Sequence, residues 1–174
     1  MKTSVRIGNQ TAFSACSVTE PFEFAVDSGF DAFEWFPDKK STGAGWRADD
    51  LSAALRKWIR NTASANDIRL TVHSGVDFRV AGPNALQPLT GDIHFARDIG
   101  AVLFVMHLLH ADDKRSLVES ILSLVFALKQ DCIMLAVENA PETTPEDVNG
   151  FFDFVADRGI DGVGMCFDIG HANL

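Results

Sequence analysis

Residues 133–139, IMLAVEN, and residues 163–172, VGMCFDIGHA, decide the fold class. Each segment is an apolar run that leads to an acidic residue, Glu138 in the first and Asp168 in the second. The runs are apolar nearly throughout instead of alternating with polar residues, which is typical of parallel strands covered on both faces. Because a helical pattern lies between them, the two segments predict a strand–helix–strand unit and an α/β fold.

The rest of the chain repeats this order of short apolar runs and longer amphipathic segments. Residues 51–59 and 117–128 place apolar side chains on one face of a helix, and Thr144 followed by Pro145 predicts a helix start. We expect six strands, near Val5–Gly8, Ala32–Phe36, Arg69–His73, Val102–His107, Ile133–Glu138 and Val163–Asp168.

A short internal repeat predicts the corners between helices and strands. Residues 22–31 align without gaps on residues 152–161, with five of the ten positions identical, and residues 96–101 form a weaker third copy. Each copy contains a glycine where a helix would end in a left-handed residue before the next strand begins. The repeat therefore indicates one architecture built from similar units.

The length of the chain limits how many such units it holds. Polar residues at the ends of strands two to six are separated by 39, 34, 31 and 30 residues. Eight units of this size would need roughly 250 residues, the usual size of a (β/α)8 barrel, whereas this chain has 174. A doubly wound sheet could stop at six strands. We expect one domain over residues 1–174, an α/β fold of the TIM-barrel type that is incomplete, with about six βα units.

Composition and charge exclude several classes of protein. The chain carries 15 basic and 24 acidic residues, a net charge of −9, and no basic cluster, which argues against a nucleic-acid partner. Its three cysteines lack metal-type spacing and favour a reducing compartment. The N-terminal residues lack the apolar stretch of a secretory signal, and no apolar run is long enough for a membrane span. We expect a cytoplasmic protein.

Polar residues that can do chemistry follow the apolar runs. In parallel α/β folds, ligands bind at the carboxyl ends of the strands, so these side chains are expected to meet at one mouth. Carboxylates and imidazoles are ligands that suit Zn²⁺ or Mn²⁺. A carboxylate after an apolar strand is costly to bury without a partner. The candidate residues are Glu34, His73, His107, Glu138, Asp168 and His171.

The segments LAVEN and GMCFDIGHA, together with Phe33-Glu34 and Val72-His73, closely resemble the xylose isomerase-like TIM-barrel superfamily. Its members include sugar and sugar-phosphate isomerases and epimerases, and apurinic endonucleases of the endonuclease IV type. The resemblance implies that Glu138 and Asp168 are metal ligands and that Glu138 also transfers a proton. It implies that His171 contacts substrate in an isomerase or binds a further zinc in a nuclease.

Further residues receive roles from the same resemblance. It implies that His73 and His107 bind substrate or extra metals and that Asn139 orients Glu138. Glu34, between two aromatic residues, is either a substrate contact or a surface carboxylate. Trp35 and Phe78 are candidates for apolar walls of the site, or equally for packing aromatics.

The sequence departs from the family at its end. The family takes a further His and Glu from strands seven and eight, and nothing in this sequence corresponds to them. A divalent metal (Mn, Zn, Co or Mg) held by the remaining ligands would be bound weakly or not at all, and half of the acid–base pair would be missing.

Three functions follow as hypotheses. The first is a metal-dependent sugar or sugar-phosphate isomerase or epimerase, acting by proton transfer alpha to a carbonyl of a small-molecule sugar. The second is an endonuclease IV-like phosphodiesterase on abasic DNA, which the negative charge disfavours. The third is a non-catalytic truncated barrel that binds a ligand or partner. In any of these, exposed barrel edges favour a homo-oligomer.

Overall fold

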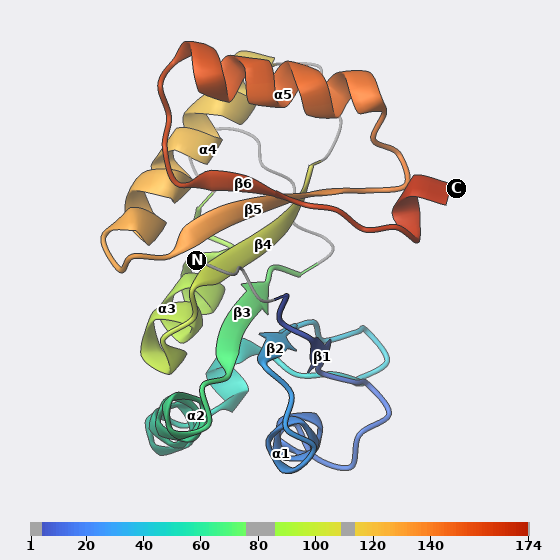
Figure 1. The fold of residues 1–174 in the computed structure, drawn as a ribbon, viewed down its shortest axis with the longest axis vertical. Coiled ribbons are helices and arrows are strands. Elements are labelled where there is room, and N and C mark those ends of the chain that lie inside the picture. The colour runs from blue at the N-terminus through green and yellow to red at the C-terminus, as the bar shows by residue number, and fades with distance from the viewer. Residues whose placement is uncertain (1–4, 76–85, 109–113, 174) are drawn as a thin grey trace.

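The computed structural model describes residues 5–75, 86–108 and 114–173. It has the expected α/β fold: six parallel strands alternate with helices and form one sheet in the order β1-β2-β3-β4-β5-β6 (Figure 1). The strands are β1 (Gly8–Gln10), β2 (Ala32–Trp35), β3 (Arg69–His73), β4 (Leu103–Leu108), β5 (Met134–Asn139) and β6 (Val163–Cys166). The helices are α1 (Glu20–Asp27), α2 (Ala53–Ala65), α3 (Thr90–Ile99), α4 (Lys114–Lys129) and α5 (Pro145–Asp157), with 3-10 turns η1 (Ala48–Asp50) and η2 (His171–Asn173).

The sheet is an open, barrel-like array. Strand β1 pairs with β2 and strand β6 pairs with β5, and no pairing joins β1 to β6 within the part of the chain that is described. The strands are parallel throughout, and β4 and β5 form the longest ladder of the sheet. This is the incomplete barrel that the sequence predicts. Of the helices that the structure describes, none has both the length and the apolar character needed to cross a bilayer.

Two strands, β1 and β6, differ from the prediction by more than one residue. The first strand begins at Gly8 instead of Val5, and Val5 and Ile7 are 87% and 65% exposed. The apolar residues Val5 and Ile7 led to a predicted strand that starts too early. The position of β1 is decided by its pairing with β2, which starts at Gly8 opposite Ala32. The sixth strand ends at Cys166, so the segment that carries Asp168 lies beyond the sheet.

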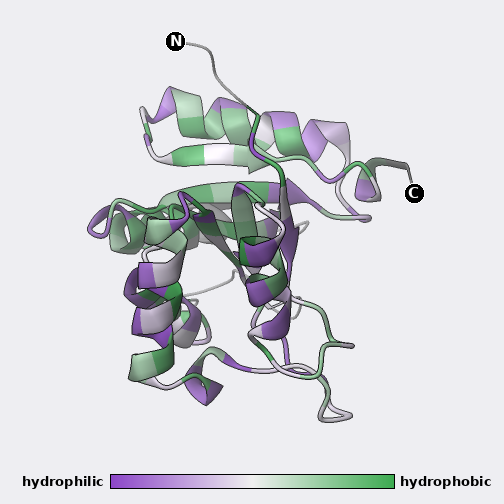
Figure 2. Cartoon of the chain, turned by 60° about the horizontal axis from the view of Figure 1, so that its bottom comes forward, coloured by the Kyte–Doolittle hydropathy of each residue, from purple (hydrophilic) through white to green (hydrophobic). Residues whose placement is uncertain are grey.

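The main core lies between the outer face of the sheet and the helices. Trp35 is fully buried there, and the centroids of four aromatic rings lie 4.9–5.8 Å from its own. Burying a large apolar side chain contributes about 1.5–3 kcal/mol, and each aromatic contact adds about 0.5–1.5 kcal/mol. The alternative reading of Trp35 as a wall of the site is therefore wrong, and Phe78 lies outside the described residues. Figure 2 shows that the strands other than β1 (GNQ) are largely hydrophobic, whereas the helices present both hydrophobic and polar residues.

The glycine corners of the internal repeat form as predicted. Gly29, Gly100 and Gly159 follow α1, α3 and α5 and have positive φ angles of 70°, 74° and 59°. A residue with a Cβ would be strained in this conformation, which is why a glycine occupies each of these three corners. The predicted start of α5 is also confirmed, because the Thr144 side chain accepts a hydrogen bond from the Asp147 amide.

Candidate functional site

Five of the six candidate residues meet at the carboxyl ends of the strands. His73 is the last residue of β3, while His107 and Glu138 are each the penultimate residue of their strands, β4 and β5. Asp168 follows β6, and His171 begins η2. Side-chain donor atoms form two groups, each with its atoms within 4.8 Å of one another: His73, His107 and Glu138 in one, and Glu138, Asp168 and His171 in the other. Glu138 belongs to both.

His73 and Glu138 form a buried hydrogen-bonded pair. His73 Nε2 lies 2.9 Å from Glu138 Oε2, and both residues are 6% exposed. His73 Nδ1 lies 2.6 Å from the carbonyl oxygen of Ser74, which can only accept, so this nitrogen carries a proton. Burial alone would lower the pKa of His73, but the hydrogen bonds to Glu138 and Ser74 outweigh it and raise the pKa.

His107 stands between the two other histidines. Its Nε2 lies 3.9 Å from Glu138 Oε1, and its ring centroid is 4.9 Å from that of His73 and 5.5 Å from that of His171. Burial lowers the pKa of His107, and the positive charge of His73 lowers it further. A lowered pKa favours the neutral imidazole, which is the form that binds a metal ion.

The segment after β6 is connected to the end of β5 by hydrogen bonds. His171 Nδ1 donates to the carbonyl oxygen of Asn139 over 2.8 Å, and the His171 amide donates to Asp168 Oδ1 over 2.8 Å. This second bond is the main reason why the pKa of Asp168 is lowered. Because Nδ1 carries the proton, His171 keeps Nε2 as the nitrogen with a free lone pair. Asn139 makes its side-chain contacts with the Asp168 backbone, not with Glu138 as the family resemblance implies.

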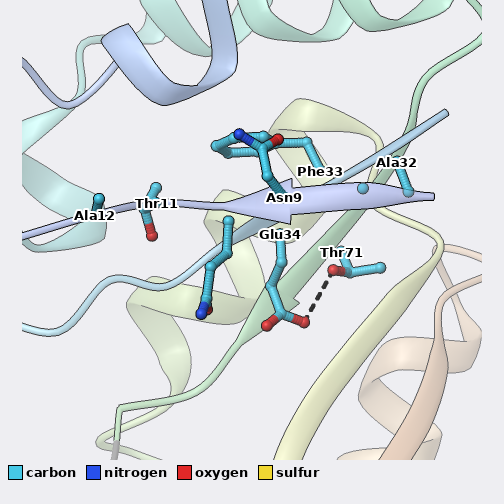
Figure 3. Close-up of a pocket in the computed structure, with 9 residues that line it drawn as sticks. Asn9, Thr11, Ala12, Ala32, Phe33, Glu34 and Thr71 are labelled. Carbon is cyan, nitrogen blue, oxygen red and sulfur yellow. Dashed lines mark hydrogen bonds between the residues drawn. The ribbon is translucent and has the colours of Figure 1, made fainter. Parts of the chain in front are cut away.

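Glu34 lies apart from both groups. It points with Thr71 to one side of the sheet, and Phe33 points to the other (Figure 3). Thr71 donates a hydrogen bond of 3.1 Å to Glu34 Oε2, and both residues line an open hollow beside β1. Burial raises the pKa of Glu34 despite the opposing effects of His73 and Thr71. Glu34 therefore faces the same interior as His73 but does not join the cluster of possible metal ligands.

The donor set of the cluster fits a divalent metal ion. It consists of three imidazoles and two carboxylates, with no thiolate in either group, which is the chemistry preferred by Zn²⁺ and Mn²⁺. His73 and His171 each bond one ring nitrogen to a backbone carbonyl, as metal-binding histidines usually do. Glu138 is a buried carboxylate surrounded by histidines. These residues can hold a metal.

Two residues of this interior were not anticipated from the sequence. Thr71 is the hydrogen-bond partner of Glu34, and Cys166 pairs directly with Glu138 in the β5–β6 ladder. Burial raises the pKa of the Cys166 thiol to about 11, and the nearby carboxylates add to this effect. The signal was available for Thr71, because a residue two positions before His73 lies on the same face of a strand.

The sequence of the chain matches a known family. The sequence profile of the xylose isomerase-like TIM barrel family matches residues 22–174, and the chain belongs to this family. No protein with curated annotation matches it in sequence.

Solved structures share the fold at low sequence identity. D-psicose 3-epimerase from Clostridium cellulolyticum, solved with D-tagatose, superposes with a TM-score of 0.71 at 18% identity, covering 98% of this chain and 65% of that one. A xylose isomerase domain protein from Planctomyces limnophilus gives 0.66 at 15%, covering 97% and 64%. A probable 3-DHS dehydratase from Bacillus anthracis gives 0.67 at 12%, covering 96% and 64%. The chain thus spans a little under two thirds of the length of these proteins, and the likeness establishes the fold.

Proposed function

We propose that this chain carries part of the catalytic site of a metal-dependent isomerase or epimerase that acts on a sugar or sugar phosphate. The observation that carries the proposal is the group formed by Glu138, Asp168 and His171, whose donor atoms lie within 4.8 Å of one another. The fold likeness to a D-psicose 3-epimerase supports the choice of reaction. The reaction would be proton transfer at a carbon next to a carbonyl group.

The residues of the site would have different roles in this reaction. A divalent ion held by Glu138, Asp168 and His171 would polarise the carbonyl and hydroxyl oxygens of the substrate and so acidify the neighbouring C–H bond. Glu138 Oε1 lies 3.9 Å from His107 Nε2 and 3.8 Å from His171 Nδ1. Glu138 Oε2 is then the oxygen that accepts the proton, and His73 Nε2, 2.9 Å away, stabilises that oxygen.

The remaining candidates would bind the substrate. His107 is 16% exposed at its side chain, so it can reach a bound molecule. Glu34 and Thr71 line the hollow beside β1, where they offer a carboxyl and a hydroxyl group to sugar hydroxyls. The ligand implied by these groups is a small polyhydroxylated molecule.

The proposal is tested by metal binding and by turnover. We expect Mn²⁺, Co²⁺, Zn²⁺ or Mg²⁺ to bind, measured by calorimetry, and a panel of aldoses and ketoses to be interconverted or epimerised in the presence of that metal. Glu138→Ala should abolish binding, whereas Glu142→Ala, an exposed carboxylate four residues further on, should not. The proposal fails if no sugar is converted and Glu138→Ala leaves metal binding unchanged. Binding without turnover would instead favour the non-catalytic alternative.

A zinc phosphodiesterase acting on abasic DNA is the second candidate. The observation that favours it is that the two groups share Glu138, so the cluster offers two neighbouring metal positions, as phosphodiester cleavage often requires. The net charge of −9 opposes it. Cleavage of an abasic duplex that a chelator stops would replace the sugar proposal with this one.

We infer that the chain is one domain that forms a homo-oligomer through its sheet edges. Met165, Phe167 and Ile169 alternate along β6 and the segment after it, and they are 45%, 62% and 69% exposed. A second copy is the occupant we propose, because β6 lacks a second neighbour within the described sheet. Light scattering should show an oligomer for the wild type and a monomer for Phe167→Ser. Phe126→Ser, on α4, is the control and should leave the oligomer intact. A monomeric wild type would refute this inference.

We also place the protein in the cytoplasm. Cys16, Cys132 and Cys166 are all free, which fits a reducing environment. Cell fractionation would test this assignment.

A further inference from the structure

Asn139 connects two parts of the site through its side chain. It is the last residue of β5 and is 7% exposed. Its Nδ2 donates to the carbonyl oxygen of Asp168 over 2.9 Å, and its Oδ1 accepts from the Asp168 amide over 2.8 Å. The side-chain amide thus makes the two hydrogen bonds that a neighbouring peptide group would make.

These bonds replace a ladder that has already ended. The β5–β6 pairing runs to Glu138 opposite Cys166, and Asp168 lies two residues beyond it. Asp168 then binds the His171 amide through Oδ1, and His171 Nδ1 donates back to the Asn139 carbonyl, each over 2.8 Å. Four hydrogen bonds therefore join Asn139, Asp168 and His171 in a closed circuit.

We propose that Asn139 is a positioning residue: its amide fixes Asp168 and His171 relative to Glu138. The inference rests on the proposed metal site, because these three residues form one of its ligand groups. The Asp168 side chain is 36% exposed and lies beyond the end of β6, so the amide of Asn139 connects this segment to β5 where the strand ladder no longer does. Only a side chain with both a donor and an acceptor can make the pair of bonds, which excludes aspartate as a substitute.

The first test needs no metal. In the metal-free protein, ¹⁵N NMR should show His171 protonated at Nδ1, and the Asp168 amide should exchange slowly. Asn139→Ala should speed this exchange by about tenfold, the effect of losing roughly one hydrogen bond, and should mix the two tautomers of His171. Thr143→Val is the matched control, because Thr143 bonds the Leu108 carbonyl and the Ala140 amide on the same rim without touching Asp168. It should change neither signal.

The second test uses Mn²⁺ alone. Asn139→Ala should weaken binding by about 10- to 100-fold, the usual effect of removing a partner that orients metal ligands. Asn139→Asp keeps the acceptor but loses the donor, and should also weaken binding. Thr143→Val should stay within about threefold of wild type. Equal losses in Asn139→Ala and Thr143→Val, or an unchanged His171 tautomer in Asn139→Ala, would overturn the assignment. If the wild type binds no Mn²⁺, the proposed function fails, and the NMR measurements still decide the role of Asn139.

Discussion

Asp92 provides the sharpest test of the electrostatics of this structure. It lies in the first turn of α3, and the backbone of Gly75, just after β3, is hydrogen-bonded to its carboxyl group. Burial raises the pKa of Asp92 from 3.8 to about 7; the Gly75 bond opposes this rise, while the charge of Asp49 adds to it. A carboxyl with such a pKa is protonated in the folded protein over a wide range of pH.

The raised pKa makes the stability of the protein depend on pH in a defined direction. The folded state binds the proton more tightly than the unfolded state, so the stabilisation is complete below about pH 4 and is lost as the pH rises to about 7. The full shift corresponds to about 4 kcal/mol. Because the side chain is partly exposed, we expect about half of that, roughly 2 kcal/mol.

Asp92→Asn removes the charge and keeps an acceptor for the Gly75 amide. In urea unfolding, the variant should be more stable than wild type by about 2 kcal/mol near pH 8 and equal to it near pH 4. Asp161→Asn is the control, because Asp161 is fully exposed and its pKa is lowered by its bond to Lys129. It should give no such gain. A difference between Asp92→Asn and wild type that is the same at both pH values would refute the reasoning.

Three further predictions concern stability. The guanidinium of Arg56 donates hydrogen bonds to two backbone carbonyls and to Asp98. Arg56→Met should therefore lower the free energy of unfolding, measured in urea, by about 2–4 kcal/mol. Asp98→Asn breaks only a half-exposed ion pair and should lower it by less than about 1 kcal/mol. Gly100→Ala should destabilise the protein by about 1–2 kcal/mol in the same assay, because the φ angle of Gly100 is positive. Gly150 lies inside α5 with free space around it, so Gly150→Ala should stabilise the protein by up to about 1 kcal/mol. Trp35→Ala should lower the free energy of unfolding by about 3–5 kcal/mol but leave Mn²⁺ binding to the folded protein unchanged, since its ring packs outside the sheet.

The sequence predicted those features that depend on local pattern. Apolar runs located β3 fully and β2, β4 and β5 to within about a residue, because buried parallel strands need apolar residues on both faces. Polar residues at the ends of these runs indicated the cluster around Glu138, because a carboxylate that follows a buried strand needs a partner.

Features that depend on pairing between distant segments could not be predicted in the same way. The first strand contains Asn9 and Gln10, whose place is set by their partners in β2 and not by their own hydropathy. The role of the Asn139 amide depends on where β6 ends, which no local pattern marks. The burial of Trp35 in the core could have been predicted, because side chains alternate along a strand and Trp35 must point away from the face that Glu34 occupies.

The opposite directions of Glu34 and Trp35 in β2 have a consequence for how this protein can evolve. Inserting or deleting one residue in the strand would send the indole into the polar interior and the carboxylate into the aromatic core, so such changes are excluded. Length variation is therefore expected in the connections and not within this strand. The connections that follow the strands adjoin the cluster at the strand ends, so their lengths can change beside the cluster while the packing of the core stays unaltered.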